Sequence, residues 1–286
     1  MENRQNVELI FGTAQLVNSY GITRETEHQR DPDEAFEFLA YVEEVGIKTI
    51  DTAPAYGDAE LVIGSTGIPF SIHTKLGHGL NARASLIKSK IALCTESIDV
   101  VYVHNIEEFR EDSSKIVREL APLLEVGVGA IGVSIYEESD WDLVRQYEEI
   151  NVVQVPMSIY DQRFAGKILD EIRQSDRRCF VRSVFLQGVL LASPQNLRPE
   201  VQHLRPYIEE FNLQIAAEGI DAVSACLSWV AVQEGVSGII VGAQNPQELS
   251  GIIGAWADIS STAESLSWTE SLMIPSWDQT DPRKWN

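Results

Sequence analysis

The sequence is poor in positive charge and in cysteine. Lysine and arginine together number 22 against 43 acidic residues, which gives a formal net charge of −21. So acidic a chain repels polyanions, and we therefore exclude nucleic acid and anionic membranes as expected partners. The three cysteines, Cys94, Cys179 and Cys226, are scattered through apolar segments. We expect reduced, buried thiols rather than disulfides.

Long apolar runs and metal-binding motifs are also absent from the sequence. No stretch approaches the roughly 18 apolar residues of a membrane-spanning helix. The first residues have neither the basic nor the apolar region of a signal peptide. No C-x-x-C or H-E-x-x-H spacing occurs, so no metal site is expected. We predict a cytoplasmic protein.

Eight short apolar runs rich in β-branched residues divide the chain. They lie at residues 9–14, 49–51, 71–75, 100–104, 130–134, 152–155, 180–183 and 238–241. Between most of them, apolar residues recur at three- and four-residue spacing, which is typical of helices. One helix is expected to begin with Asp31 as N-cap and Pro32 as its first residue, and to end before Gly46. Others are expected at 85–94, 114–124, 140–149 and 222–233.

Eight strands alternating with helices predict an α/β fold, a (β/α)8 TIM barrel in a single domain over residues 1–286. A doubly wound sheet is the competing architecture. It usually carries a glycine-rich turn after the first strand, and the residues that follow Gly12 form no such turn. The longest step, 183–238, contains three prolines, so we expect an excursion loop and an extra helix there.

The tail at about 258–286 differs in composition from the rest of the chain. It carries three of the six tryptophans, Trp268, Trp277 and Trp285. Two arrangements are open: the tail packs on the outside of the barrel, or it brings a tryptophan over the mouth of the site.

Four titratable residues end or follow successive apolar runs, namely Asp51, Tyr56, Lys75 and His104. In a barrel, the C-terminal ends of neighbouring strands converge, and active sites are built there. A lysine ammonium beside a phenol stabilises the phenolate and lowers the phenol pKa from about 10. A carboxylate holds the ammonium in place, and an imidazole can orient a carbonyl oxygen. The set therefore favours proton donation to a carbonyl oxygen, as hydride reduction requires.

The sequence resembles the aldo-keto reductase family over about residues 9–257. The resemblance is carried by a DTA-x-x-YG-x-x-E string at 51–60, by the later Lys75 and His104, and by weaker motifs such as GVS at 132–134. It implies a (β/α)8 barrel that binds NADPH or NADH in an extended pose and acts on a small carbonyl substrate. It also implies that Tyr56 is the general acid, that Lys75 and Asp51 tune it, and that His104 orients the substrate.

The same resemblance implies contacts with the cofactor and the substrate. Thr13 and Asp51 would approach the nicotinamide ribose, and Ser134 and Gln154 would hydrogen-bond the carboxamide. The other cofactor contacts that it implies are Gly12, Arg182, Ser183, Gln187, Gly188, Leu190, Gly242, Gln244 and Gln247. Asn105 and Arg163 are expected to bind substrate beside Tyr56 and His104, although Arg163 could equally form a structural pair with Asp161.

Three positions depart from the family pattern. Ile135 stands where asparagine is frequent, and Arg182 stands where an aromatic ring commonly stacks on the nicotinamide. Arg182 can stack its guanidinium there, bind an anionic group, or pair with a buried acid. The run after Val241 has no cation for the 2′-phosphate of NADPH and includes Glu248, so weak NADP selectivity is expected.

Three functions remain open from the sequence. The first is an NAD(P)-dependent carbonyl reductase or alcohol dehydrogenase for a polar carbonyl compound such as a sugar. The second is a non-catalytic protein that senses the nicotinamide redox state. The third is a redox-neutral lyase or epimerase that uses Tyr56 and Lys75 as acid and base. Binding of NADH or NADPH, followed by fluorescence, separates the first two from the third.

Overall fold

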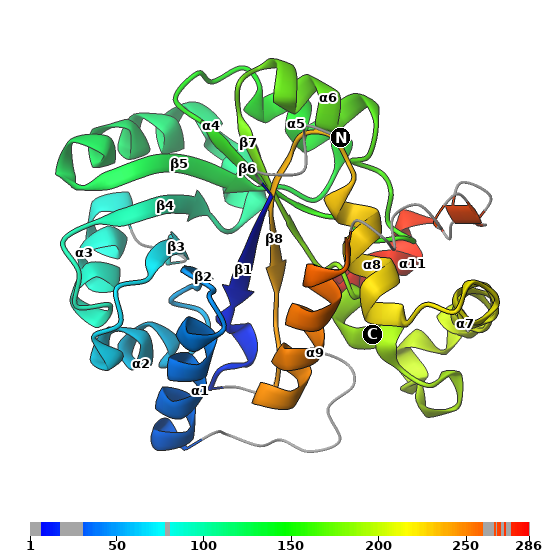
Figure 1. Cartoon of the computed structure of the whole chain (residues 1–286). Helices are drawn as coiled ribbons and strands as arrows, with labels where there is room; N and C mark the ends of the chain where they lie inside the picture. The colour runs from blue at the N-terminus through cyan, green and yellow to red at the C-terminus, as the bar shows by residue number, and fades with distance from the viewer. Residues whose placement is uncertain are drawn as a thin grey trace.

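Eight parallel strands form a closed barrel in chain order in the computed structural model. The structure describes residues 7–17, 31–77, 81–259, 266, 268–269, 272 and 276–285. Strands β1 and β8 close the barrel and lie side by side (Figure 1), with Leu9 opposite Ile239. The strands are β1 (Glu8–Gly12), β2 (Thr49–Asp51), β3 (Ser71–Lys75), β4 (Ile98–Val103), β5 (Val128–Ser134), β6 (Val152–Pro156), β7 (Arg178–Arg182) and β8 (Val236–Val241). The predicted (β/α)8 barrel is confirmed.

Each predicted strand is present, and most of the ends differ by one or two residues. The first strand ends two residues early at Gly12, where the chain turns into a short 3-10 helix (Thr13–Gln15) instead of continuing as strand. Strands β2 and β3 have the predicted bounds. Accordingly, Asp51 and Lys75 are the last residues of their strands, as the sequence indicated.

Helices surround the strands in Figure 1. They are α1 (Pro32–Glu44), α2 (Ala59–Thr66), α3 (Ala82–Ala92), α4 (Ile106–Leu120), α5 (Glu138–Val144), α6 (Lys167–Gln174), α7 (Arg205–Glu218), α8 (Ala222–Ala231), α9 (Pro246–Ala257) and α11 (Trp277–Thr280). Helix α1 begins as predicted, because the Asp31 carboxylate accepts a hydrogen bond from the Asp33 N–H at 2.9 Å. Helix α7 is the extra helix expected in the long step after β7. Helices α2, α6, α9 and the short α11 were not among the predicted segments.

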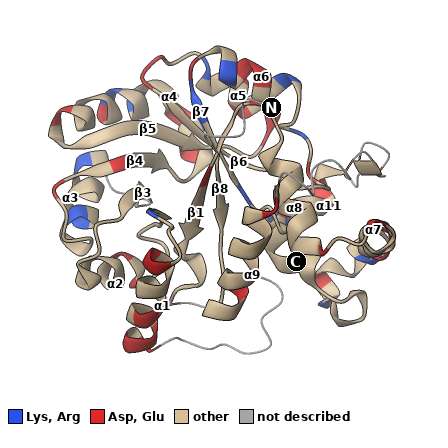
Figure 2. Cartoon of the chain, in the orientation of Figure 1, with Lys and Arg blue, Asp and Glu red and all other residues tan. Residues whose placement is uncertain are grey.

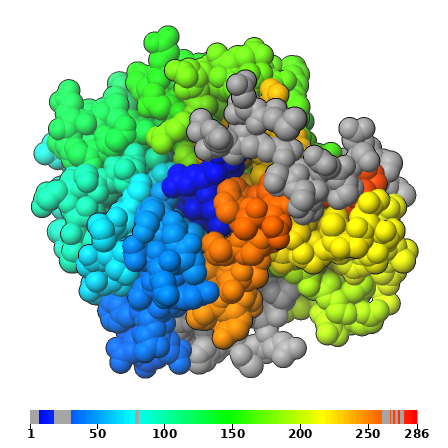
Figure 3. All heavy atoms as spheres, viewed as in Figure 1, coloured from blue at the N-terminus to red at the C-terminus, as the bar shows by residue number. Residues whose placement is uncertain are grey.

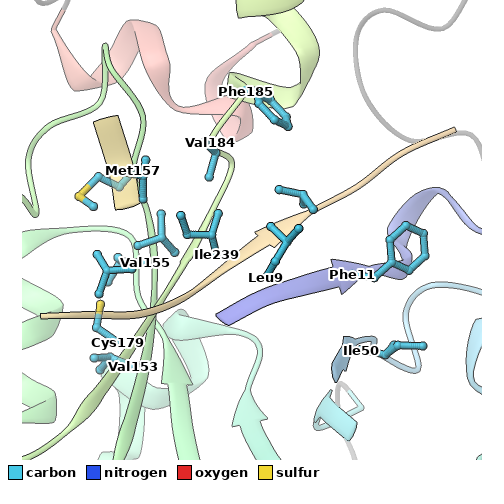
Figure 4. Close-up of a cluster of buried hydrophobic side chains, with 14 of the residues drawn as sticks. Leu9, Phe11, Ile50, Val153, Val155, Met157, Cys179, Val184, Phe185 and Ile239 are labelled. Carbon is cyan, nitrogen blue, oxygen red and sulfur yellow. The ribbon is translucent and has the colours of Figure 1, made fainter. Parts of the chain in front are cut away.

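The apolar core has two layers because successive strand residues point to opposite faces of the sheet. The barrel interior holds Ile10, Val100, Tyr102, Ala130, Val152, Phe180 and Ile240. The layer between strands and helices takes the alternate positions, such as Leu9 and Phe11 of β1 and Ile239 of β8 (Figure 4). Gly132 makes room for the interior tyrosine: a Cβ there would lie 2.5 Å from the Tyr102 ring.

The outer surface carries the acidic excess. Figure 2 shows Asp and Glu on the helices around the barrel, for example on α1. Figure 3 shows α1 and α9 next to each other on one face. In the part of the chain that the structure describes, no helix is long and apolar enough to cross a membrane. Among the same residues, no group of three or more His, Cys, Asp and Glu side chains is placed to hold a metal ion.

The expectation of three buried thiols is wrong for one cysteine. Cys179 and Cys226 are buried, whereas Cys94 is exposed. Cys94 follows the end of α3 with a left-handed backbone (φ 50°), so the chain leaves the helix there and turns the side chain to solvent. Burial raises the pKa of the Cys179 thiol to about 12 and raises that of Cys226 further. These two thiols are therefore inert near neutral pH.

Candidate active site

The four titratable residues singled out in the sequence meet at the C-terminal end of the barrel. Asp51 ends β2, Lys75 ends β3, and His104 directly follows β4. Tyr56 lies in the turn between β2 and α2, which is fixed by a hydrogen bond from its own N–H to the Ala53 carbonyl oxygen at 2.9 Å. The strands are neighbours in the barrel, so residues 24 to 53 positions apart in sequence line one cavity.

A buried ion pair lies at the base of the site. The Lys75 ammonium is 2.5 Å from one carboxylate oxygen of Asp51, and the two side chains are 2% and 5% exposed. Lys75 also donates to the Thr52 carbonyl oxygen at 2.9 Å. The other Asp51 oxygen accepts a hydrogen bond from the Gln154 amide at 2.8 Å. Both oxygens of the carboxylate are therefore held, one from β3 and one from β6.

The charge balance around Lys75 and Tyr56 sets their protonation. Burial is the largest single effect and would lower the pKa of Lys75, but Asp51 and Tyr56 together outweigh it, and the pKa is raised. The Lys75 ammonium lies 5.0 Å from the centroid of the Tyr56 ring. Burial raises the pKa of Tyr56 above its usual value, and the Lys75 charge offsets only part of that rise. The expected net lowering of the phenol pKa is therefore not found, although Lys75 acts in the predicted direction.

His104 faces the phenol across the cavity. The two rings are edge to face, with centroids 6.2 Å apart and planes at 87°. Burial and the positive charge of Lys75 lower the pKa of His104 to about 4. The imidazole is therefore neutral near neutral pH and carries one N–H that can donate to an oxygen placed between the two rings.

A cavity of about 840 Å³ opens above these residues, large enough for a dinucleotide-sized ligand. The structure brings most of the predicted site residues to its wall. Those that line it are Gly12, Asp51, Tyr56, Lys75, His104, Ser134, Gln154, Arg182, Ser183, Gln187, Gly188, Gly242 and Gln244. They come from all eight strands or the loops that follow them, so the cavity crosses the whole mouth of the barrel.

The side chain of Gln154 has an unpaired hydrogen-bond acceptor in this cavity. Its amide nitrogen is used by Asp51, but its carbonyl oxygen is buried without a partner among the described residues. A buried acceptor left unpaired costs about 1–3 kcal/mol. A primary amide group bound here, such as the carboxamide of nicotinamide, would supply the missing donor. Ser134, also buried and on the adjacent strand β5, faces the same cavity.

Five other predicted contacts lie away from the wall of the main cavity, namely Thr13, Asn105, Arg163, Leu190 and Gln247. Thr13 is buried and donates to the Asp51 carbonyl oxygen at 3.1 Å. Leu190 is buried in the outer core, and Gln247 is exposed on the first turn of α9. Asn105 caps α4 by accepting from the Glu107 N–H at 3.0 Å, and it lines a second cavity of about 290 Å³ that shares His104 with the first.

Arg163 forms the structural pair that was weighed against a substrate role. Its guanidinium binds both carboxylate oxygens of Asp161. It also donates to the Tyr136 carbonyl oxygen at 2.7 Å. Its donors are thus used to join the loop after β6 to the loop after β5.

No acidic side chain among the described residues forms an ion pair with Arg182. Its guanidinium carbon lies 4.2 Å from the centroid of the Tyr136 ring. Its hydrogen bonds to the described residues are long ones, to the Ser183 hydroxyl at 3.4 Å and the Ile135 carbonyl oxygen at 3.5 Å. The side chain therefore leaves β7 and reaches across the end of β6 to β5.

The loop after β7 has a strained backbone. Ser183, Leu186 and Gln187 have φ values of 62°, 49° and 55°, a left-handed region that costs such residues free energy. Gly188, at φ 90°, continues the run without that cost. Strain of this kind is retained where surrounding structure demands it, and here it shapes one wall of the cavity.

Several residues of the cavity wall were not predicted from the sequence. Tyr136, Ser193, Asn196, Arg198 and Glu248 all line the cavity. They lie in loops or at a helix start, where apolar periodicity gives no signal. Glu248 alone had been noted, as a charge close to the eighth strand. The sequence signal for Arg198 was its positive charge within the long segment after β7.

One cavity at the mouth of the barrel therefore brings together a phenol, a neutral imidazole and a buried ammonium–carboxylate pair. Comparison with known proteins identifies the family. A sequence model of the Aldo/keto reductase family matches residues 8–272. The chain belongs to the Aldo/keto reductase family. It is therefore an oxidoreductase enzyme of a family that uses NAD(P)H and acts on small carbonyl substrates.

Solved structures share the fold at low sequence identity. An aldo-keto reductase from Bacillus halodurans, in its holo form, has a TM-score of 0.71 at 18% identity, with 94% of each chain covered. A glycerol dehydrogenase from Gluconobacter oxydans has a TM-score of 0.67 at 20% identity, again over 94% of each chain. A Pseudomonas aeruginosa protein classed as an aldo-keto reductase has a TM-score of 0.66 at 24% identity, over 92% of each chain. No curated protein sequence matches the chain.

Proposed function

We propose that the protein reduces a polar aldehyde or ketone, with Tyr56 as the general acid. The observation that carries this proposal is the meeting of the Tyr56 phenol, the His104 imidazole and the Lys75–Asp51 pair on one cavity wall. A nicotinamide cofactor, when bound, supplies the hydride. The protein's own groups must then supply a proton to the carbonyl oxygen as it gains negative charge.

The proton path follows from the geometry of these side chains. A carbonyl oxygen between the two rings accepts from the neutral His104 N–H and from the Tyr56 hydroxyl. Tyr56 gives up its proton to that oxygen, and the phenolate that remains faces the Lys75 ammonium. Asp51 keeps Lys75 charged and, being held by Gln154, keeps it in position. The reverse sequence oxidises an alcohol, with the phenolate as base.

The cofactor-holding wall runs from β5 to β8. We assign Ser134 and the free oxygen of Gln154 to the carboxamide, because the buried acceptor needs a donor. The strained loop that contains Gln187 and Gly188, together with the nearby Arg198, would lie against the pyrophosphate of the cofactor. Backbone N–H groups and an arginine suit that anion.

Glu248 supports a preference for NADH over NADPH. Its carboxylate lines the cavity and accepts hydrogen bonds from the Gln244 N–H at 2.8 Å and from the Asn245 amide at 3.4 Å. These bonds hold a negative charge at the start of α9. A ribose 2′-hydroxyl can donate to such a carboxylate, whereas a 2′-phosphate is repelled. Two negative charges facing one at roughly 6 Å in water cost about 1.4 kcal/mol, or about tenfold in affinity.

Steady-state kinetics with both cofactors test this function directly. A panel of polar and apolar aldehydes should be reduced with a higher kcat/KM for NADH than for NADPH. Glu248→Gln should raise affinity for NADPH about tenfold and leave affinity for NADH within about threefold, as read by quenching of cofactor fluorescence. Cofactor binding without reduction of any carbonyl or oxidation of any alcohol would defeat the proposal. Much faster turnover with NADPH would defeat only the assignment of Glu248.

A further inference from the structure

Three arginines gather around Tyr136, which joins β5 to α5 at the cavity mouth. Arg182 and Arg283 both stack on its ring, with guanidinium carbons 4.2 Å and 3.8 Å from the centroid. Arg163 binds its carbonyl oxygen. Arginine commonly stacks on aromatic rings, so the stacking of Arg182 and Arg283 does not by itself indicate a function. The difference between them lies in their negative partners.

Two of these arginines are neutralised within the protein. Arg283 is bound by the Asp281 carboxylate, with one contact at 2.6 Å, and it lies 3.9 Å from Glu137. Arg163 is bound on two nitrogens by Asp161. Both aspartates are buried, which makes these pairs a fixed part of the loops. The protein therefore uses carboxylates freely to neutralise arginine in this region.

Arg182 alone of the three lines the main cavity and has no carboxylate within ion-pair distance among the described residues. A guanidinium has five N–H donors, and the two bonds that Arg182 makes are at the long limit of a hydrogen bond. The side chain is only partly buried and lines the cavity, so donors that these two bonds do not use are available to a ligand there. The chain has a net charge of −21, so acidic side chains are plentiful. The lack of an acidic partner for Arg182 among the described residues is therefore a specific feature of this site.

The position of Arg182 points to the substrate. It shares the cavity wall with Tyr56 and His104. Its positive charge adds to the lowering of the His104 pKa and acts against the rise of the Tyr56 pKa. Its reach across β6 to the Ile135 carbonyl oxygen places it over the barrel mouth rather than along the loop toward Arg198. A ligand whose carbonyl lies between Tyr56 and His104 would therefore extend toward the guanidinium.

We propose that Arg182 is the receptor for an anionic group on the carbonyl substrate, so that the enzyme prefers aldehydes or ketones that carry a carboxylate or phosphate. The planar fork of the guanidinium matches both groups, and Tyr136 holds it in one orientation. This inference rests on the proposed reductase function and adds the substrate class. Arg182 then determines specificity without taking part in proton transfer.

Matched substrate pairs test the proposal. Succinic semialdehyde carries a carboxylate and butanal is its neutral counterpart; glyceraldehyde 3-phosphate and glyceraldehyde form the phosphate pair. In the wild-type enzyme, kcat/KM should be at least about tenfold higher for the anionic member of one pair. Arg182→Gln should lower it about 10- to 100-fold, mainly through KM, because one charged hydrogen-bonding contact is worth roughly 1.5–3 kcal/mol. The neutral member should change less than about threefold.

Two further variants separate charge, geometry and position. Arg182→Lys keeps the charge but loses the fork, so it should restore only part of the preference. Arg178→Gln makes the same charge change at the exposed opposite end of β7 and should leave the preference intact. Equal losses for charged and neutral aldehydes in Arg182→Gln would overturn the proposal. So would weaker NADH binding with no change in substrate preference, since the anion met by Arg182 would then be the cofactor's phosphate.

A binding measurement keeps this inference distinct from the proposed reaction. Succinate and inorganic phosphate, tested separately with the NADH-loaded protein, should raise the Tm of the wild type more than that of Arg182→Gln. If no carbonyl is reduced but this difference is found, the reductase function fails and the anion site stands. If carbonyls are reduced and neither anion distinguishes the two proteins, the anion site fails and the reductase function stands.

Discussion

Removing one member of the buried Lys75–Asp51 pair should cost much more stability than removing both. In Lys75→Met, the Asp51 carboxylate stays buried and keeps only the Gln154 amide as a donor. Breaking a buried pair in this way typically costs 3–5 kcal/mol. Asp51→Asn leaves the buried ammonium without a carboxylate, with the Thr52 carbonyl oxygen and the Tyr56 hydroxyl as neutral partners, and a similar loss is expected. Against a total stability of about 5–15 kcal/mol, each single change is readily measured.

The double variant Asp51→Asn/Lys75→Met removes both charges and keeps an amide that can bind Gln154. It should lie within about 2 kcal/mol of the wild type, because neutral replacements of similar size are tolerated where single ones are not. Urea unfolding followed by tryptophan fluorescence and circular dichroism gives the free energy of unfolding of all four proteins. The two single losses should therefore sum to far more than the double loss.

An exposed pair of the same length provides the control. Lys48 and Glu43 are also 2.5 Å apart, but their side chains are 64% and 44% exposed. Lys48→Met should cost less than about 1 kcal/mol. Additive losses in the buried cycle, or equal losses at Lys75 and Lys48, would show that burial does not govern the energetics of this pair.

Three further outcomes are expected. Tyr56→Phe should keep cofactor affinity within about threefold and lower kcat at least about 100-fold, since the ring stays and the acid goes; wild-type kcat would disprove the assignment. Burial lowers the pKa of His73 to about 4 in the folded state. The unfolded chain takes up the proton first as pH falls, so stability present above pH 6.5 should drop by about 3 kcal/mol toward pH 4. His73→Asn should lack this part of the acid slope. A maleimide should label Cys94 rapidly in the folded protein, while Cys179 and Cys226 react only after unfolding, as peptide mass spectrometry will show.

The sequence was enough to predict where the strands lie and that the four titratable residues meet at their ends, because both follow from local pattern and strand order. Apolar runs fix where strands end, and the order of strands in a barrel makes their ends neighbours. The direction of a long side chain carries no such pattern. Arg182 crosses β6 to reach Tyr136, and Arg163 turns to Asp161; neither follows from spacing. The exposure of Cys94 depends on a single left-handed residue.

The electrostatics were predictable in sign for each pair and not in sum. Proximity of Lys75 to Tyr56 follows from strand order, and its effect on the phenol pKa has the expected direction. How deeply the ring is buried depends on loops from several strands, and that burial decides the net shift. The same holds for Gln154: its place on the sixth strand was evident, whereas its bond to Asp51 requires the closed barrel.

The stacking of Arg283 on Tyr136 links the C-terminal segment to the cavity wall, and this gives the protein a built-in optical reporter. The indole of Trp277 in the same segment has the Lys284 ammonium 3.6 Å from its ring centroid and the Arg163 guanidinium carbon at 5.4 Å. Indole emission responds to nearby charge. A ligand that displaces Tyr136 would shift Arg163 and Arg283 and so change the emission of Trp277. Ligand binding in the cavity could therefore be followed by the intrinsic fluorescence of the protein.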